Sequence, residues 1–270
     1  MGLLYISKEG EHKLTVPRIY FPGDIGKGKI CKLGGQNLRY VKSVLRMKKG
    51  DHLILFDGTG CEYETLIEDF FADGITVKVL KKDSIPDKGV KITLYQALPK
   101  ANKMDFIIQK ATELGADRIV PFQSARSIPR LSVDKARLKI SRWRNIATEA
   151  ARQCGRADIP EVGGILSYEE VITCSEREKL KIIFWEEESV RGIKQVLRGE
   201  EYNGVNDISV IIGPEGGFSR EEVDGAVGKG FISVSLGRNI LKVETAALTI
   251  LSIIQYEKGI FGGELKWEVD

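Results

Sequence analysis

The chain is predicted to combine an N-terminal β-barrel with a C-terminal α/β domain built on a mainly parallel sheet. Residues 17–85 read as short strands separated by turn residues, whereas apolar strands alternate with helical periodicity beyond residue 89. With 270 residues, 42% of them hydrophobic and 29% charged, the chain is long enough to bury two cores. We therefore expect one domain at residues 1–86 and another at 87–270.

The N-terminal strands are recognised by β-branched and aromatic runs that end at Asp-Gly turns, at 57–58 and 73–74. The expected strands are Arg18–Pro22, Lys29–Leu33, Asp51–Phe56, Tyr63–Glu68 and Ile75–Leu80. One helix is expected among them, at Asn37–Arg46. The proline, glycine and charges of Asp83–Gly89 are typical of a linker, which sets the domain boundary.

The C-terminal elements alternate in type, which indicates an α/β domain. The expected strands are Ile92–Leu98, Arg118–Phe122, Ile182–Trp185, Ile208–Ile212 and Ile232–Leu236. Helices are expected at Lys103–Leu114, where Asn102 is the candidate N-cap and Gly115 follows the end, and at Asp134–Cys154. The last helix, Glu244–Tyr256, is apolar over most of its circumference and must be buried inside the domain or at a dimer interface.

Charge is distributed unevenly along the chain, although the net charge is only +3. Residues 1–49 carry 11 basic and 3 acidic residues, and residues 91–160 carry 14 and 6, so each segment has a net charge of +8. Residues 50–90 (4 basic, 9 acidic) and 161–270 (12 basic, 20 acidic) have net charges of −5 and −8. Two basic segments suggest a polyanionic partner, and an ordinary solvated surface is the alternative.

The cysteines and histidines give no support for a metal site. The four cysteines lie far apart without a CxxC pair, and only His12 and His52 are available to complete a cluster. We expect reduced, structural thiols and no metal. Apolar runs are too short to span a bilayer and the N-terminus lacks a basic segment followed by an apolar one, so we expect a cytoplasmic protein without a membrane partner.

The most informative segment is Ile211–Ser219, an apolar strand that runs into a glycine-rich turn and a helix start. Ser219 and Glu222 have the spacing of a capping box, and ligands bind at this end of the strands in open α/β sheets. The glycines permit positive φ or close approach to a ligand, so Gly216→Val should abolish ligand binding. The alternative interpretation is that the glycines only form a tight turn between strand and helix. Neither GxxxxGK[ST] nor GxGxxG is present, which argues against nucleotide hydrolysis and nicotinamide chemistry.

A second loop reaches the same edge of the sheet, because the next strand ends at Ser235–Gly237 and the last helix begins within Asn239–Ala247. Neither histidine lies in the α/β domain, so no Ser/His/Asp or Cys/His arrangement can be assembled there. A hydrolase is therefore disfavoured.

Short motifs in both domains, in a consistent order, together resemble one known family. They are Pro17–Tyr20, Val44–Arg46 with Gly50–Asp51, Leu55–Gly58, Gln109–Gly115, Glu149–Ala150 with Gln153–Arg156, Ile159–Pro160, Gly213–Gly217 and Leu236–Ala246. The chain resembles the RsmE family of 16S ribosomal RNA (uridine-N3) methyltransferases, within the SPOUT superfamily.

The resemblance implies a PUA-like β-barrel that holds RNA and a SPOUT domain with a deep trefoil knot that binds S-adenosyl-L-methionine. It also implies a homodimer that methylates N3 of one uridine in 16S ribosomal RNA, either free or within the assembled small subunit. Two residues depart from the family pattern: Lys242 stands where arginine is usual, and Tyr40 where histidine is usual. Lysine keeps the charge of arginine but not its planar fork of donors.

Candidate site residues follow from the resemblance and from the chemistry of the reaction. The expected cofactor-binding residues are Phe184, Trp185, Glu186, Ile212, Gly213, Pro214, Gly216, Leu236, Gly237, Ile240, Leu241, Thr245 and Ala246. A cation beside the base would stabilise loss of the N3 proton, so Arg156 and Lys242 are the catalytic candidates, with Glu215 as a proton acceptor. The expected RNA-binding residues are Arg18, Arg46, Lys100, Arg126, Arg152 and Gln153. Structural salt bridges are the alternative role for each charged candidate.

Two other functions remain open from the sequence. A non-catalytic RNA-binding or ribosome-assembly protein would explain the basic segments and the barrel, but not two loops that meet at one sheet edge. A related SPOUT methyltransferase would act on a ribose 2′-hydroxyl or on another base.

Overall fold

The computed structural model describes residues 16–23, 25–26, 29–84, 89–175 and 178–262. By their contacts the residues form two compact units, one of Met1–Pro86 with Thr148–Ile159 and the other of Asp87–Ala147 with Pro160–Asp270. Residues 85–88, in the expected linker, lie outside the described part, as does His12. The division of the chain at residue 86 therefore stays a proposal.

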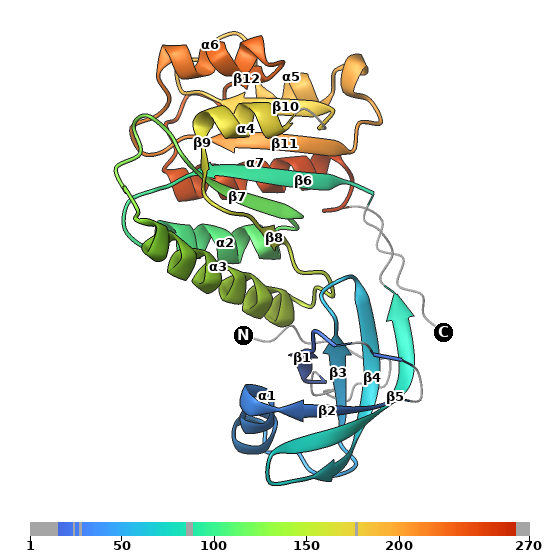
Figure 1. Ribbon diagram of the computed structural model, residues 1–270. Coiled ribbons are helices and arrows are strands. Elements are labelled where there is room, and N and C mark those ends of the chain that lie inside the picture. Colours follow the sequence, from blue (N-terminus) through green and yellow to red (C-terminus); the bar gives the residue numbers. More distant parts are fainter. Residues whose placement is uncertain (1–15, 24, 27–28, 85–88, 176–177, 263–270) are drawn as a thin grey trace. The chain divides into compact units, whose positions relative to one another are not determined.

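The first unit contains a five-stranded sheet in the order β1-β3-β4-β5-β2 (Figure 1), curled around an apolar core. Its strands are β1 (Arg18–Tyr20), β2 (Ile30–Gly34), β3 (His52–Phe56), β4 (Cys61–Phe70) and β5 (Gly74–Ser84). The β1–β3 pair is parallel and the other pairs are antiparallel. All five expected strands are confirmed, but Asp83 and Ser84 belong to β5 and not to a linker, because pairing with β4 continues to Cys61.

The expected helix at Asn37–Arg46 is present with different ends. Helix α1 (Gly35–Arg39) continues into a π-helical turn at Tyr40–Val44. Arg46 has a φ of +54°, a left-handed conformation that cannot continue a right-handed helix. The predicted C-terminal end of this helix was therefore wrong, and Arg46 is an exposed loop residue.

The second unit contains a seven-stranded sheet in which every pairing is parallel. Its order is β12-β10-β11-β6-β7-β8, with β9 also paired to β7. The strands are β6 (Lys91–Ala97), β7 (Arg118–Gln123), β8 (Glu161–Val162), β9 (Leu166–Ser167), β10 (Leu180–Phe184), β11 (Asp207–Ile212) and β12 (Ile232–Val234). The predicted parallel α/β domain is confirmed; the deep trefoil knot stays a prediction.

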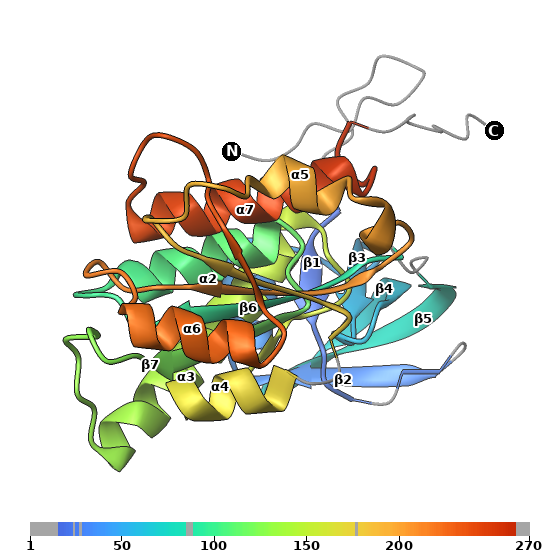
Figure 2. The ribbon, with the colours of Figure 1, turned by 90° about the horizontal axis from the view of Figure 1, so that it is seen from above.

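Helices cover both faces of this sheet, with α2 and α7 on one face and α4 and α6 on the other (Figure 2). The helices are α2 (Lys103–Glu113), α3 (Val133–Cys154), α4 (Tyr168–Cys174), α5 (Ile193–Leu197), α6 (Arg220–Gly228) and α7 (Val243–Glu257), with a 3₁₀ turn at Glu200–Tyr202. Val171 of α4 and Val223 of α6 pack in one core with alternate residues of the central strands, such as Tyr95 and Ile211.

Two helix N-caps were predicted, at Ser219 and at Asn102, and the structure describes both. The capping box of α6 is confirmed, since Ser219 Oγ accepts from the Glu222 N–H (3.2 Å) and Glu222 Oε2 accepts from the Ser219 N–H (2.9 Å). Asn102 precedes α2 as predicted, but its side chain does not cap the helix. Its backbone, with φ −99° and ψ 16°, is not in the extended conformation typical of a side-chain N-cap.

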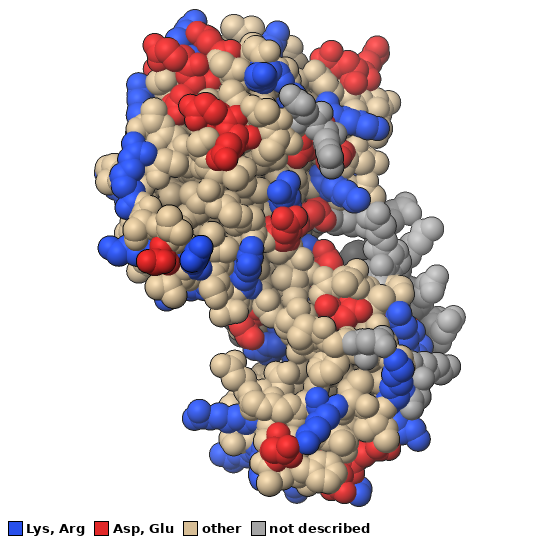
Figure 3. Space-filling model, in the orientation of Figure 1, with Lys and Arg blue, Asp and Glu red and all other residues tan. Residues whose placement is uncertain are grey.

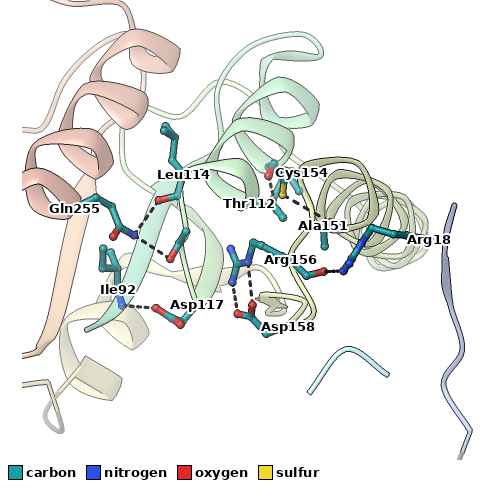
Figure 4. A network of polar contacts seen from close by, with 12 residues as sticks. Arg18, Ile92, Thr112, Leu114, Asp117, Ala151, Cys154, Arg156, Asp158 and Gln255 are labelled. Carbon is teal, nitrogen blue, oxygen red and sulfur yellow. Dashed lines mark hydrogen bonds and ion pairs between the residues drawn. The ribbon is translucent and has the colours of Figure 1, made fainter. Parts of the chain in front are cut away.

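The last helix is anchored to the far end of α2, close to the sheet (Figure 4). Gln255 Nε2 donates to the carbonyl oxygens of Leu114 (3.0 Å) and Gly115 (3.4 Å), and Gly115 has the positive φ expected after a helix end. No helix in the described part of the chain is long and apolar enough to cross a membrane. Among the described residues, no group of His, Cys, Asp and Glu is arranged to hold a metal ion.

Candidate active site

A cavity of about 480 Å³ opens at the carboxyl ends of three neighbouring strands, β10, β11 and β12. Its residues come from the segment after β10, the glycine-rich turn after β11, the loop after β12 and the first turn of α7. The lining consists of Lys103, Phe184, Trp185, Glu186, Ile212–Gly217, Ser235–Val243 and Ala246. Parallel strands bring segments that are distant in sequence to one edge, which is the usual location of a ligand site in open α/β sheets.

Almost all the expected cofactor-binding residues line this cavity. The exception is Thr245, which is exposed on the first turn of α7 and does not belong to the lining. Of the three catalytic candidates, Glu215 and Lys242 line the cavity, whereas Arg156 belongs to the first unit. The sequence did not single out Lys103, Arg238 or Asn239, which also line the cavity.

The glycines of the turn after β11 have different roles. Gly217 has a φ of +65°, a conformation that favours glycine, and a Cβ there would lie 1.8 Å from Oε1 of the exposed Glu186 side chain, which would have to turn aside. Gly216 does not have a positive φ, and its Cβ would meet Arg126 Cβ at 3.3 Å. Of the two reasons given for glycine in this turn, positive φ applies to Gly217 and not to Gly216, where close approach to a ligand stays a prediction.

Glu215 is held in place by the loop that precedes α2. Its carboxylate accepts hydrogen bonds from the Lys100 N–H (3.1 and 3.2 Å) and from Lys103 Nζ (2.9 Å). Burial acts to raise the pKa of this carboxyl, but the hydrogen bonds from Lys103 and from the backbone outweigh it and hold the pKa below the ordinary value of 4.5. An ionised carboxylate with these partners positions the loop and is a weak proton acceptor.

Lys103 joins two of the segments around the cavity. Its ammonium lies 2.9 Å from Glu215 Oε1 and 3.4 Å from Glu244 Oε2, on the first turn of α7. The hydrogen bond to Glu215 is the main reason that the pKa of Lys103 is raised, so the cation is retained at neutral pH. A sequence signal existed, because Lys103 begins the helix that follows the carboxyl end of β6.

We expect the contribution of Glu215 to stability to disappear in acid. Because its folded pKa is depressed, the contribution is full above pH 4.5 and is lost as the pH falls through the lower folded value. The difference in unfolding free energy between wild type and Glu215→Gln should therefore narrow below pH 4.5. Urea denaturation at pH 7 and at pH 4 measures this difference, and an unchanged difference would contradict the proposed ion pair.

The loop after β7 supports the same turn from another side. Arg126 Nη1 donates to the carbonyl oxygen of Gly216 (2.9 Å), and Glu222 Oε1 accepts from the Ala125 N–H (2.9 Å). Glu222 thus connects the cap of α6 with the loop that carries Arg126. Loops after β6 and β7 therefore fix the glycine-rich turn before any ligand binds, which lowers the cost of binding.

Three expected RNA-binding or catalytic arginines are largely buried within the first unit. Arg18 Nη2 donates to the carbonyl oxygen of Arg156 (3.0 Å; Figure 4) and lies 2.5 Å from Glu62 Oε1. The side chain of Arg156 pairs with Asp158 (Nε–Oδ1 3.2 Å). The exposed side-chain fractions of Arg18 and Arg156 are 16% and 13%; Arg18 fastens segment 148–159 to the strands of this unit, and the Arg156 side chain is paired within the segment.

Arg152 is similarly engaged. Its guanidinium stacks over the Tyr40 ring at 4.9 Å, donates to Tyr40 Oη (2.9 Å) and pairs with Glu149. By contrast, Arg46, Lys100, Arg126 and Gln153 are exposed. The tyrosine that departs from the family pattern is therefore part of the packing of the π-helical turn against α3.

The face seen in Figure 3 does not carry a single basic patch. Lysine and arginine side chains are distributed over both units, and acidic side chains gather over α4 and α6. The exposed acidic residues of these helices are Glu169, Glu170, Glu221 and Asp224. On this face the charge asymmetry of the sequence appears as a group of acidic side chains over α4 and α6 of the second unit.

Comparison with known proteins identifies the family. The family model described as RNA methyltransferase domain matches residues 86–255, and that described as RNA methyltransferase PUA domain matches residues 33–80. Ribosomal RNA small subunit methyltransferase E of Bacillus subtilis is 30% identical over 239 residues, which cover 85% of this chain and 91% of that protein.

Solved structures agree with this result. The Neisseria gonorrhoeae ribosomal RNA small subunit methyltransferase E bound to S-adenosyl methionine is 30% identical, with a TM-score of 0.80, covering 89% of this chain and 97% of that one. A Legionella pneumophila methyltransferase in complex with SAM is 33% identical, also with a TM-score of 0.80, covering 90% and 98%. The resemblance drawn from the motifs is confirmed, and the chain belongs to the RNA methyltransferase family that includes ribosomal RNA small subunit methyltransferase E.

Proposed function

We propose that this protein transfers the methyl group of S-adenosyl-L-methionine to N3 of one uridine in 16S ribosomal RNA. The observation that carries the proposal is the cavity at the ends of β10, β11 and β12, lined by the family motifs Gly213–Gly217 and Leu236–Ala246. The small-subunit RNA substrate follows from the curated relatives, and the reaction belongs in the cytoplasm, where ribosomal RNA is found.

The lining of the cavity suits this cofactor. Residues 238–241 make no backbone hydrogen bond to any described part of the chain, so their N–H and C=O groups are available for the edge of an adenine ring. Apolar Ile212 and Leu236 provide surfaces for its faces. When bound, the cofactor would supply a methyl group on a sulfonium, and the residues of the cavity would hold it for transfer to the acceptor nitrogen.

Loss of the N3 proton is the costly part of the reaction. A uracil N3–H titrates roughly 2 to 3 pH units above neutrality, which corresponds to about 3–4 kcal/mol at pH 7. Lys242 remains our candidate for stabilising the anion, and Lys103 is a second cation in the cavity. Because Glu215 is ionised and fully engaged, we assign it a positioning role.

Exposed cations are the better candidates for RNA contacts. Arg46 on the first unit, and Lys100 and Arg126 beside the cavity, have exposed side chains suited to phosphate binding. We assign Arg18, Arg152 and Arg156 to the internal packing of the first unit, since their guanidinium groups already have partners there.

The protein is expected to be a homodimer. Helix α7 is buried on one side, but Tyr256 remains 63% exposed and Ile240, in the preceding loop, 88% exposed, and a partner would cover these apolar side chains. Multi-angle light scattering at micromolar concentration should give about twice the chain mass of 30.1 kDa. A species of the single-chain mass across that range would reject the dimer.

The reaction is tested by incubating the protein with S-adenosyl-L-methionine and either naked 16S ribosomal RNA or assembled small subunits from a strain that lacks the enzyme. Nuclease digestion and mass spectrometry should reveal 3-methyluridine, and the better substrate shows whether assembly is required. A 2′-O-methyl nucleoside or another methylated base would favour the related methyltransferase activities. RNA binding without cofactor binding in calorimetry would favour a non-catalytic assembly protein.

A further inference from the structure

The two carboxylates that line the cavity differ in their surroundings. Glu215 is neutralised by Lys103 and by a backbone N–H. Glu186, directly after Trp185 at the end of β10, accepts no hydrogen bond and forms no ion pair with any residue that the structure describes. The cavity therefore contains one carboxylate that lacks a cationic partner within the chain.

The position of Glu186 is defined by its neighbours. A Cβ on Gly217 would lie 1.8 Å from Oε1 of Glu186. The carboxylate therefore occupies space that the absent side chain of Gly217 leaves open. The preceding residue is fixed to the sheet, because the Trp185 N–H donates to the carbonyl oxygen of Val234 (3.1 Å). Glu186 is thus an exposed carboxylate that lies beside the turn bordering the cavity.

We propose that Glu186 binds the α-ammonium group in the amino-acid part of S-adenosyl-L-methionine. This inference rests on the proposed function and assigns a specific role to one residue of the cavity. An unpartnered carboxylate beside a cofactor cavity is available to bind a cation, and the cofactor has two, the ammonium and the sulfonium. A charge-assisted hydrogen bond from an ammonium is among the stronger polar contacts in water.

The sulfonium is excluded as the main partner by the chemistry of the reaction. Its positive charge disappears as the methyl group leaves, so a carboxylate beside it would stabilise the reactant more than the transition state and slow the transfer. The ammonium keeps its charge throughout, and binding it costs no catalytic rate. Glu186 therefore contributes to affinity and orientation, with little effect on the methyl transfer step itself.

The test measures binding of three ligands to Glu186→Gln by calorimetry: S-adenosyl-L-methionine, S-adenosylhomocysteine and 5′-methylthioadenosine. The first two carry the ammonium, only the first carries the sulfonium, and the third lacks the amino-acid part. We expect affinity for the first two to fall by about tenfold, as for loss of one exposed charge-assisted contact, and affinity for the third to stay unchanged. Glu187→Gln, exposed and outside the cavity lining, is the matched control.

Other outcomes would overturn the assignment. A loss confined to S-adenosyl-L-methionine would show that Glu186 faces the sulfonium, and an equal loss for all three ligands would show a structural role. Unchanged affinities would show no contact at all, and thermal melting of the variant checks its folding. Failure of the wild-type protein to bind any of the ligands would instead refute the proposed function.

Discussion

Gly217→Val is expected to weaken S-adenosyl-L-methionine binding by on the order of a hundredfold or more, while the chain stays folded. Valine is strongly disfavoured at a φ of +65°, and its Cβ would occupy the space of the Glu186 carboxylate. The exposed Glu186 side chain can turn aside, so the main cost is backbone strain, which would shift the turn that lines the cavity. Calorimetry measures the affinity, and circular dichroism confirms that the fold is retained.

Two other glycines provide controls for this variant. A Cβ at Gly225 in α6 would meet nothing within 4 Å, so Gly225→Val should leave cofactor affinity unchanged. Gly216→Val should have an intermediate effect, because its Cβ needs only a small shift of Arg126. If Gly217→Val bound the cofactor as tightly as Gly225→Val does, the glycine-rich turn would be a connection without a role in the site.

Phe218→Ala is expected to destabilise the protein by about 3–5 kcal/mol and to loosen the turn after β11. The Phe218 ring is 1% exposed and packs against the Tyr168 ring, with 5.9 Å between centroids. The ring would also lie 3.1 Å from a Cβ on Gly213, so it packs against the backbone of a residue that lines the cavity. Urea denaturation measures the loss, and weaker cofactor binding should accompany it.

Phe106→Ala is the matched control, because this phenylalanine on α2 is 44% exposed. Its replacement should cost less than about 1 kcal/mol and leave cofactor affinity unchanged. Saturating cofactor should recover part of the stability lost in Phe218→Ala, since a ligand that binds only the folded state stabilises it. Equal losses in the two variants would contradict the supporting role assigned to Phe218.

The sequence alone determined the fold class, most of the longer strands and helices, and the two segments that form most of the cavity. Strand and helix periods are local properties, and the parallel arrangement follows from their alternation. The carboxyl ends of such strands meet at one edge, so Gly213 and Leu236 were assigned to one site although they are far apart in sequence. The capping box of Ser219 is also local, and it was predicted correctly.

Only the tertiary structure decided which charges pair and which stay free. Lys103, Glu215 and Glu244 come from three separate segments, and no pattern along the chain shows that they meet. The buried roles of Arg18 and Arg156 depend on the association of segment 148–159 with the first unit.

The conformations of single residues were also beyond the sequence. A run of glycines permits positive φ at any of them, and the path of the turn in the folded domain places it at Gly217 and not at Gly216. The residue type sets which interactions a side chain can form in general. The role that it has here depends on neighbours supplied by distant parts of the chain, because charge pairing and steric exclusion act through space.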